Sequence, residues 1–556
     1  MNVHIMEKSF IAYIENSIKN NWDLNALTDY DGATLQYKDV ARKIEKIHII
    51  LEESGVKKGH KIAICGKNSS HWGVTFLAVL TYGAVAVPIL HEFKADNVHN
   101  IVNHSEAKLL FVGDVVWEGL NEAAMPGIHG VVLMNDFSLL VSRSSKLTRA
   151  REHLNELFGK KYPKNFRVEH INYHKDQPEE LALINYTSGT TSYSKGVMLP
   201  YRSLWSNVKL AFEVLDLKAG DKTISMLPMA HMYGMAFEFL YEFSAGCQIF
   251  FLTRMPTPKI IKKAFAEVKP RLIVAVPLII EKIIKKSVFP ILEKPSMKFM
   301  MKIPFLNDKI KAKIREKIID AFGGNFIQVI IGGAAFNKEI EEFLQAINFP
   351  YTVGYGMTEC APIITYEWWE DFSMASCGKA APRMEIKVLS EDPETIAGEI
   401  ICRGDNVMLG YYKNQEATDE AIRDGWLYTG DLGLIDSEGN LFIKGRSKNM
   451  LLSANGQNIY PEEIEDKLNN LPYVVESLVV QQNERLVGLV YPDLTEMMAN
   501  GYKVEDADKI MEENRVRLNE LLPAYCQISK MKVYPEEFEK TPKKSIKRFL
   551  YQEAKG

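Results

Sequence analysis

The sequence predicts an α/β protein with a large N-terminal domain of mostly parallel sheets flanked by helices, a small β-barrel-like subdomain, and a small α+β C-terminal domain. Three observations support this prediction. The chain has 556 residues, which is more than one ordinary hydrophobic core accommodates. Helical and strand patterns alternate between residues 35 and 114, as is typical of a parallel sheet covered by helices. Short strand-like segments separated by Gly and Asp turns follow Gly378.

The first alternating elements are a helix over residues 38–55, a buried strand over 61–66, and a helix that runs into a strand over 70–89. Later apolar runs each end in small or polar residues. In open parallel sheets, ligands bind at the carboxyl ends of strands, so a site is expected at these run ends. The runs are 181–186, 224–228, 272–277, 326–331 and 351–356.

The predicted domain boundary follows the β-rich segments. We expect an N-terminal domain over residues 1–446, in which 378–446 form the β-rich subdomain, and a C-terminal domain over 447–556. The boundary is placed at the basic, turn-forming stretch 445–448, because a helix opened by Pro461 and rich in early Glu follows it.

Composition is that of a soluble globular protein, with 46% apolar and 25% charged residues. The formal net charge of −4 predicts no attraction to nucleic acid. The six cysteines show no metal-binding spacing, which favours a reducing, cytoplasmic location. No run approaches the roughly 20 apolar residues that span a bilayer, so we expect any membrane contact to be peripheral, on the inner membrane face.

The most informative segment is residues 186–196, YTSGTTSYSKG, which directly follows a predicted buried strand. Its hydroxyls, successive backbone N–H groups and one lysine are the groups that wrap a polyphosphate. It is not a Walker A loop, because Lys195 is followed by Gly196. A flexible linker is the alternative interpretation. The candidate phosphate-binding residues are Thr187, Ser188, Gly189, Thr190, Thr191 and Lys195.

This loop resembles the phosphate-binding signature of the adenylate-forming (AMP-binding) superfamily. Further motifs of that family follow in the right order over nearly the whole chain, at residues 227–231, 331–335, 355–359 and 428–431. Within the family, the segments AHMYG, IGGAAFN and GYGMTECAP are most like bacterial long-chain fatty acyl-CoA synthetases. The resemblance implies that the C-terminal domain is mobile.

The resemblance also implies a role for individual side chains. His231 would steady the carboxylate substrate, Thr358 would contact phosphate, and Glu359 with Thr187 would hold Mg²⁺. Taken alone, a loop histidine or a carboxylate after a strand is more often structural or solvated. The residues expected around the nucleotide are Gly333, Ala334, Tyr355, Gly356, Asp431 for the ribose hydroxyls, and Arg446.

In the predicted C-terminal domain, Lys448 matches the family's hinge, and Gly456 lies in the segment that lines the pantetheine tunnel of relatives that use coenzyme A. Relatives carry an essential lysine at the position of Ser545. Lys544 is our first choice for that catalytic role, with Lys543 and Lys547 as alternatives and a solvated basic tail as the competing interpretation.

Together these motifs predict an AMP-forming acid–thiol ligase. With ATP and Mg²⁺ it would convert a fatty acid to acyl-AMP, release pyrophosphate, and transfer the acyl group to coenzyme A. One alternative is delivery to an acyl-carrier protein, and another is a catalytically impaired nucleotide- and acyl-binding relative. Residues 279–319 read as amphipathic helices that suit an alkyl chain and lipid headgroups, or equally a core-facing stripe with a solvated basic face.

Overall fold

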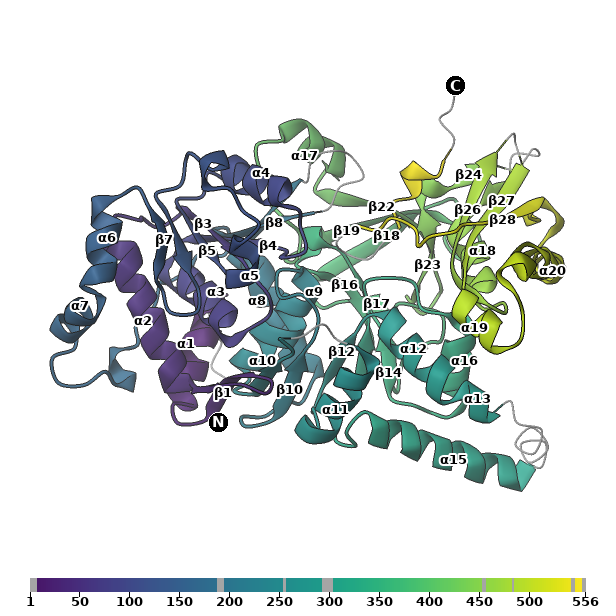
Figure 1. Ribbon diagram of the computed structural model, residues 1–556, viewed down its shortest axis with the longest axis horizontal. Coiled ribbons are helices and arrows are strands. Elements are labelled where there is room, and N and C mark those ends of the chain that lie inside the picture. Colours follow the sequence, from purple (N-terminus) through teal and green to yellow (C-terminus); the bar gives the residue numbers. More distant parts are fainter. Residues whose placement is uncertain are drawn as a thin grey trace.

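The computed structural model describes residues 8–187, 195–253, 257–292, 304–452, 457–482, 485–541 and 546–552. Its long axis runs from the large N-terminal sheets to a smaller group of C-terminal elements at the opposite end (Figure 1). The predicted α/β class, with a large and a small part, is confirmed. Within the described residues, no helix combines the length and the apolar character needed to cross a bilayer.

The largest sheet has eight strands in the order β20-β9-β8-β4-β3-β5-β6-β7. Its five central strands are parallel, while the pairings of β7, β9 and β20 are antiparallel. The strands are β3 Lys61–Cys65, β4 Val85–Ile89, β5 Leu109–Val112, β6 Gly130–Leu133, β7 Leu139–Ser142, β8 Leu181–Tyr186, β9 Gly196–Pro200 and β20 Gly410–Tyr411.

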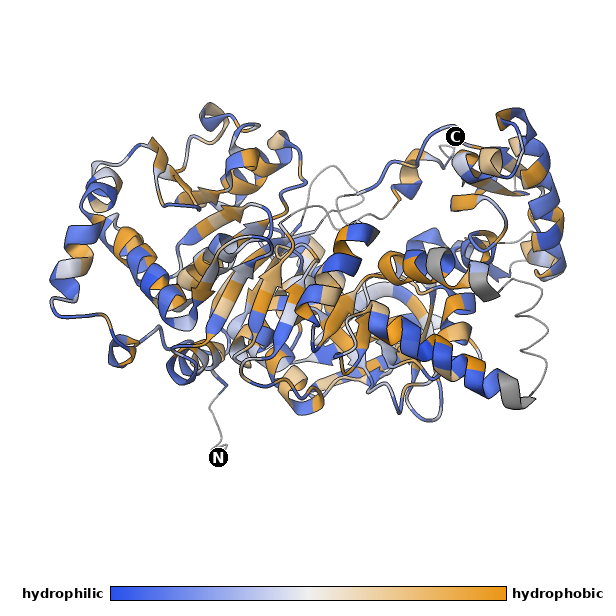
Figure 2. Cartoon of the chain, turned by 60° about the horizontal axis from the view of Figure 1, so that its bottom comes forward, coloured by the Kyte–Doolittle hydropathy of each residue, from blue (hydrophilic) through white to orange (hydrophobic). Residues whose placement is uncertain are grey.

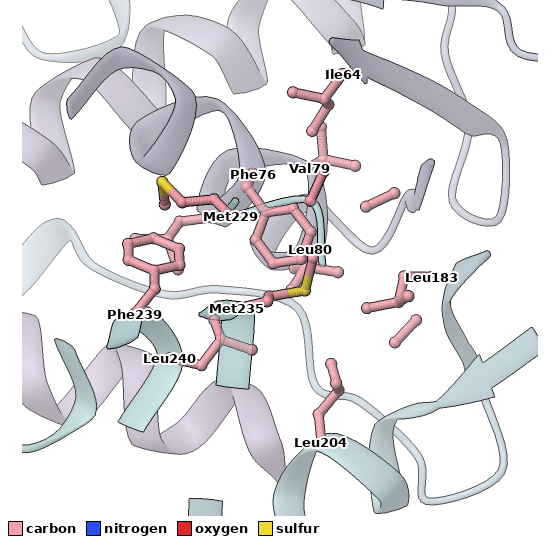
Figure 3. Packing of buried hydrophobic residues seen from close by; sticks show 14 of the residues in the cluster. Ile64, Phe76, Val79, Leu80, Leu183, Leu204, Met229, Met235, Phe239 and Leu240 are labelled. Carbon is pink, nitrogen blue, oxygen red and sulfur yellow. The ribbon is translucent and has the colours of Figure 1, made fainter. Parts of the chain in front are cut away.

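Helix α3, Ser70–Tyr82, is buried along its whole length except near its N-terminal end and at Tyr82, because helices and sheet surround it. Figure 3 shows Phe76, Val79 and Leu80 packed between sheet residues such as Ile64 and Leu183 and the helical segment that carries Phe239. The neighbouring helices are α1 Phe10–Asn20, α2 Tyr37–Glu53, α4 Ala95–Ser105, α5 Asp114–Trp117, α6 Ser145–Glu152, α7 Leu154–Lys161, α8 Tyr201–Val214, α9 Met232–Met235, the π-helical turn η3 Ala236–Leu240 and α10 Tyr241–Ser244.

Two smaller sheets continue the body of the N-terminal part. One has the order β10-β11-β1-β2, and the other is the fully parallel sheet β12-β13-β14. Their strands are β1 Asn25–Asp29, β2 Thr34–Gln36, β10 Lys222–Ser225, β11 Gln248–Phe251, β12 Ile273–Ala275, β13 Val329–Ile331 and β14 Tyr351–Val353. Four of the five apolar runs predicted from the sequence therefore contain a strand, and the fifth, 224–228, overlaps the end of β10.

The segment 279–319 is helical where it is described, as predicted. Its helices are α12 Pro277–Ser287, α13 Phe289–Leu292 and α15 Pro304–Ala321, and residues 293–303 lie outside the described part of the chain. Helix α15 runs along the edge of the molecule (Figure 1), and hydrophilic residues cover much of it (Figure 2). Helices α11 Pro258–Val268 and α16 Lys338–Ala346 lie nearby and share a hydrophobic cluster with α12 and α15.

The segments after Gly378 are β-rich, as predicted, and two further strands, β15 and β16, precede them. One sheet has the order β15-β16-β17, and β18-β19-β22-β21 form a second, in which β23 pairs with β22. These strands are β15 Tyr355–Gly356, β16 Ile363–Tyr366, β17 Lys379–Ala380, β18 Met384–Leu389, β19 Gly398–Gly404, β21 Ile422–Arg423, β22 Trp426–Ile435 and β23 Leu441–Arg446, with helix α17 Gln415–Ala421 between them.

The C-terminal elements have hydrophobic clusters of their own. In the described chain, the two large clusters include no residue beyond Ile443, and the two small ones include none before Leu451. The elements are β24 Leu451–Leu452, β25 Asn458–Ile459, α18 Pro461–Leu468, β26 Val474–Gln482, β27 Arg485–Pro492, α19 Leu494–Ala499, α20 Ala507–Glu520 and β28 Lys530–Val533.

Candidate active site

Three predicted nucleotide residues are brought together around Asp431, in the middle of β22. The β22–β23 register places Arg446 opposite Asp431, and Arg446 Nε lies 2.8 Å from Asp431 Oδ1. Tyr355 donates its hydroxyl hydrogen to Asp431 Oδ2 at 2.6 Å. Each carboxylate oxygen keeps a further lone pair, so Asp431 can still accept from two sugar hydroxyls.

Burial governs the electrostatics of Asp431, whose exposed fraction is only 5%. Loss of hydration raises the pKa of Asp431 above its usual value, while the Arg446 charge and the Tyr355 hydrogen bond oppose that rise. The negative charge of Glu359 adds to the rise, which indicates that the two carboxylates share one local field. The carboxylates of Asp431 and Glu359 are therefore suited to a ligand that brings hydrogen-bond donors or a positive charge.

Glu359 lies in the short 3₁₀ turn η4, Thr358–Cys360, which follows β15. Both Thr358 and Glu359 are buried. Glu359 Oε1 accepts a hydrogen bond from the Tyr411 hydroxyl at 2.8 Å, and its backbone oxygen accepts from Met408 N at 2.8 Å. The sequence analysis did not predict Tyr411, which lies in β20, far from the motif in sequence.

The phosphate-loop candidates are described only at the two ends of the loop. Thr187 N donates to Lys195 O at 3.0 Å, which closes the loop where β8 turns into β9. The Lys195 ammonium lies 4.9 Å from the centre of the Tyr411 ring. The other predicted members, Ser188, Gly189, Thr190 and Thr191, lie outside the described residues.

His231 begins helix α9 as its N-cap. Its Nδ1 accepts from Tyr233 N at 3.2 Å, so in the neutral ring the proton is on Nε2, which is then the donor. Tyr233, the second residue of α9, donates its hydroxyl hydrogen to Ile330 O at 3.0 Å. The loop that carries His231 therefore packs against the end of β13, where Gly332 and Gly333 follow.

Buried polar side chains from three other elements hold the loop 227–231. Asn68 donates to Leu227 O at 2.6 Å and accepts from Met229 N at 2.9 Å. Asn185, in β8, donates to Ala230 O at 2.9 Å. These contacts fix the backbone on both sides of Pro228. The bond from Asn185 also connects this loop to β8, the strand that leads into the phosphate loop.

Glu238, in the π-helical turn η3, completes this support. Its Oε2 accepts from Met226 N at 3.0 Å and from Leu227 N at 2.8 Å. Burial raises the pKa of Glu238 well above its usual value, while the two backbone N–H groups oppose that rise. The sequence analysis missed Asn68, Asn185 and Glu238. The one available signal was a polar residue, Asn185, inside the apolar run 181–186.

Steric contacts explain the glycines of the motifs 331–335 and 355–359. A Cβ on Gly332 would lie 3.2 Å from Cζ of Tyr233, and one on Gly356 would lie 2.2 Å from Pro362 O. Gly333 has φ of +89°, a left-handed conformation that glycine adopts without strain. Gly333 and Ala334 are exposed at the end of β13. Backbone at this edge is thus accessible to a flat ligand.

The predicted C-terminal candidates are only partly described. Lys448 is exposed in the short turn η5, Ser447–Asn449, while Gly456, Lys543 and Lys544 lie outside the described residues. Lys547, an alternative for the catalytic role, forms an ion pair with Glu539. Arg548 is anchored in the C-terminal core, 2.7 Å from Glu465 Oε2 and 2.9 Å from Val479 O.

Comparison with known proteins gives relatives over most of the chain. A Mycobacterium bovis protein named long-chain-fatty-acid–CoA ligase FadD15 is 27% identical over 473 residues, covering 81% of this chain and 76% of its own. Long chain acyl-CoA synthetase 3 of Arabidopsis thaliana is 28% identical over 495 residues, covering 82% and 73%. The long-chain-fatty-acid–CoA ligase of Escherichia coli O157:H7 is 25% identical over 495 residues, covering 85% and 83%.

Solved structures share the fold. The anthranilate CoA ligase AuaEII, in complex with anthranoyl-AMP, aligns with a TM-score of 0.80 at 18% identity, over 98% of both chains. ATP-bound MatB from Rhodopseudomonas palustris aligns with a TM-score of 0.76 at 21% identity, over 98% of both chains.

Family models match most of the chain in two consecutive segments. The model described as AMP-binding enzyme matches residues 14–412, and the model described as AMP-binding enzyme C-terminal domain matches residues 448–554. The motifs around Lys195, Glu359 and His231 lie in the first match, and the basic segment that includes Lys544 lies in the second. The chain belongs to the AMP-binding enzyme family.

Proposed function

We propose that this protein is an AMP-forming fatty acid–CoA ligase. It activates a fatty acid with ATP as acyl-AMP, releases pyrophosphate, and transfers the acyl group to coenzyme A. The observation that carries the proposal is the buried Tyr355–Asp431 pair with Arg446 bound to it from the exposed side, in an electrostatic environment that includes Glu359. Long-chain acids are favoured because the relatives that match most of the chain are named for them.

Each part of the site has a role in this reaction. Asp431 accepts hydrogen bonds from the ribose hydroxyls, and Tyr355 and Gly356 border the base. Lys195 and the phosphate loop hold the terminal phosphates while the acid's carboxylate attacks the α-phosphorus. His231, with the proton on Nε2, donates to an oxygen at the reacting centre. A carboxylate oxygen is a poor leaving group, whereas AMP is a good one. A thiol can therefore displace AMP from the acyl-AMP.

The residues present fit a magnesium ion. Glu359 supplies an anionic oxygen in a buried turn, next to the loop that would hold phosphates, and hard cations prefer such ligands. Among the described residues, no cluster of three or more acidic, His or Cys side chains is arranged for a metal. The bound ion would neutralise phosphate charge. Thr187, the second candidate ligand, has its hydroxyl 3.5 Å from Lys195 O.

We place the boundary between an N-terminal domain, 1–446, and a C-terminal domain, 447–556, at the turn that contains Lys448. The separate hydrophobic clusters on the two sides of this turn support the boundary. Rotation about Lys448 would bring Lys544 to the reacting oxygens in one arrangement and the loop with Gly456 in the other. One site would thereby serve two half-reactions.

Peripheral membrane contact is part of the proposal. Lys309, Lys313 and Lys317 are exposed and recur every four residues on α15, so they share one face of that helix. Such a basic face attracts anionic headgroups, and the fatty acid substrate partitions into the same bilayer. Cosedimentation with anionic vesicles tests the contact, and recovery of all the protein in the supernatant would refute it.

The test of the function is pyrophosphate release with Mg-ATP across carboxylic acids from acetate to palmitate, each with and without coenzyme A. We expect release that coenzyme A stimulates and that is greatest with medium or long alkyl acids. If pyrophosphate release continued over many turnovers only with an acyl-carrier protein, that protein would be the acyl acceptor instead. No pyrophosphate release with any of the acids would contradict the proposal.

A matched pair of variants links the activity to the nucleotide site. Asp431→Asn removes the charge that holds Arg446, so we expect ATP affinity to fall about tenfold to a hundredfold. Asp436→Asn alters a carboxylate in the turn between β22 and β23 and should leave ATP affinity unchanged. Equal ATP affinity in the wild type and Asp431→Asn would show that Asp431 does not contribute to ATP binding.

A further inference from the structure

Tyr411 lies beside the phosphate loop because of strand pairing. It belongs to the two-residue edge strand β20, which runs antiparallel to β9 with Tyr411 opposite Val197. Strand β9 begins directly after Lys195, so this pairing places the Tyr411 ring next to the last residue of the loop. Tyr412 N donates to Gly196 O at 2.7 Å and keeps the register.

The hydroxyl of Tyr411 orients the Glu359 carboxylate. Tyr411 has an exposed fraction of 9% and Glu359 of 8%, so their 2.8 Å hydrogen bond is shielded from water. Within the described chain, no other side chain is seen to donate to that carboxylate. The bond occupies Oε1 and leaves Oε2 available to a further ligand.

The ring of Tyr411 orients Lys195. The ammonium lies 4.9 Å from the ring centre, within the range of a favourable cation–π contact. Lysine has a flexible stem of four carbons, so a defined contact lowers the entropy lost when the ammonium meets a phosphate. One aromatic side chain therefore contacts both the candidate metal ligand and the candidate phosphate ligand.

The backbone of this strand is itself fixed. Tyr411 N donates to Thr418 Oγ1 at 2.9 Å, which ties the strand to α17. Gly410 has φ of +137°, and a Cβ there would lie 2.6 Å from Thr418 Cγ2. Helix α17 can therefore approach only because residue 410 is glycine. This support limits the movement of the Tyr411 ring when ligands enter.

We infer that Tyr411 is a positioning residue of the ATP site: it holds Glu359 and Lys195 in place for the magnesium and the phosphates of ATP. The inference rests on the proposed function and adds a residue from the β-rich part of the chain. Tyr411 itself does not touch the reacting atoms. Its two contacts are separable, because the hydroxyl serves Glu359 and the ring serves Lys195.

The test compares Tyr411→Phe with Tyr411→Leu by calorimetric binding of a non-hydrolysable ATP analogue at graded Mg²⁺ concentrations. Tyr411→Phe loses only the bond to Glu359, so we expect the half-saturating Mg²⁺ concentration to rise about fivefold to tenfold. Tyr411→Leu also loses the ring, so affinity for the analogue without Mg²⁺ should fall about threefold. The KM for the fatty acid should not change in Tyr411→Phe.

Tyr412→Phe is the matched control, because that neighbouring hydroxyl donates to the exposed Glu106 at 3.1 Å, away from Glu359. It should bind Mg²⁺ and the analogue as the wild type does. Wild-type Mg²⁺ dependence in Tyr411→Phe would overturn the inference, as would an equal loss in Tyr412→Phe. If the wild type released no pyrophosphate with any acid, the proposed function would fail, while the binding titration would still decide the role of Tyr411.

Discussion

Glu341 is a buried carboxyl group whose protonation affects stability. It lies in α16 with an exposed fraction of 3%, and its Oε1 accepts from Ala375 N at 3.0 Å. Burial raises the pKa of Glu341 to about 7 from its ordinary value of 4.5. Between these two pH values the folded state binds more protons than the unfolded state, so the free energy of unfolding falls as pH rises from 4.5 to 7.

We predict that Glu341→Gln reduces the fall in the free energy of unfolding with rising pH. The amide cannot ionise, but it keeps an acceptor for Ala375 N. At pH 8 the variant should be more stable than the wild type by about 2 kcal/mol, and at pH 4.5 the two should be nearly equal. Urea unfolding at both pH values measures the difference. The control is Glu342→Gln, a half-exposed neighbour on the same helix. Parallel pH dependence in Glu341→Gln and the wild type would refute the prediction.

At the residue scale, the sequence predicted site residues where the motif is contiguous and missed those that act from elsewhere. Asp431, Arg446 and Tyr355 were predicted from three separate motifs, and the structure brings them together. Asn68 and Tyr411 reach the site only through tertiary packing, and nothing in their local sequence marks them. Periodicity reports which face of an element is buried but not which distant backbone group a side chain will meet.

At the element scale, the alternation of helix and strand was predictable because burial on both faces makes parallel strands continuously apolar. The π-helical turn η3 was not predicted, because apolar periodicity does not distinguish one π turn from the α-helical turns on either side of it. The predicted helices over 279–319 were found in the described parts of that segment, although their periodicity left open whether they face the core or a ligand.

The C-terminal segment carries the next prediction. Arg548 binds Glu465 and the Val479 carbonyl, which attaches the described end of this segment to the C-terminal core. We predict that Lys544→Ala lowers acid-dependent ATP–pyrophosphate exchange about a hundredfold, because the charge on the reacting phosphate loses its partner. Thioester formation from supplied acyl-adenylate should stay nearly unchanged, since in the proposed mechanism that step uses the other domain arrangement.

The control is Lys547→Ala, whose ammonium is already paired with Glu539 and should be dispensable. Isotope exchange between pyrophosphate and ATP measures the first half-reaction, and thiol consumption measures the second. Full exchange activity in Lys544→Ala would assign the role to Lys543, or to Lys547 if Lys547→Ala lost exchange. Loss of both half-reactions would indicate damage to the C-terminal fold instead.

At the scale of the whole molecule, a small polar interface joins the two parts of the chain. Asn337 Nδ2 donates to Asn470 Oδ1 at 2.6 Å, and Lys285 Nζ donates to Asn470 Oδ1 at 3.1 Å and to Asn469 O at 3.2 Å. Lys285 lies in α12 and Asn337 caps α16, whereas Asn470 follows α18. Polar interfaces between domains commonly permit relative motion.

If the C-terminal domain rotates as proposed, these bonds exist in only one of its arrangements. Asn470→Ala removes the shared acceptor, so we predict that the population of the arrangement described here falls about fivefold relative to the others, as expected for a loss of about 1 kcal/mol. Spin labels at the exposed positions Asp419 and Lys509 would report this as a broader distribution of distances. The ratio of the two half-reaction rates should change with it.

Asn500→Ala is the control, because Asn500 is exposed at the end of α19 within the same C-terminal part. It should leave both the distance distribution and the rate ratio as in the wild type. An unchanged distribution in Asn470→Ala would mean that the interface does not select the arrangement. Because Lys285 lies in α12, a shift in population would also show that a helix of the 279–319 segment contributes to domain position, in addition to any contact with the acyl chain.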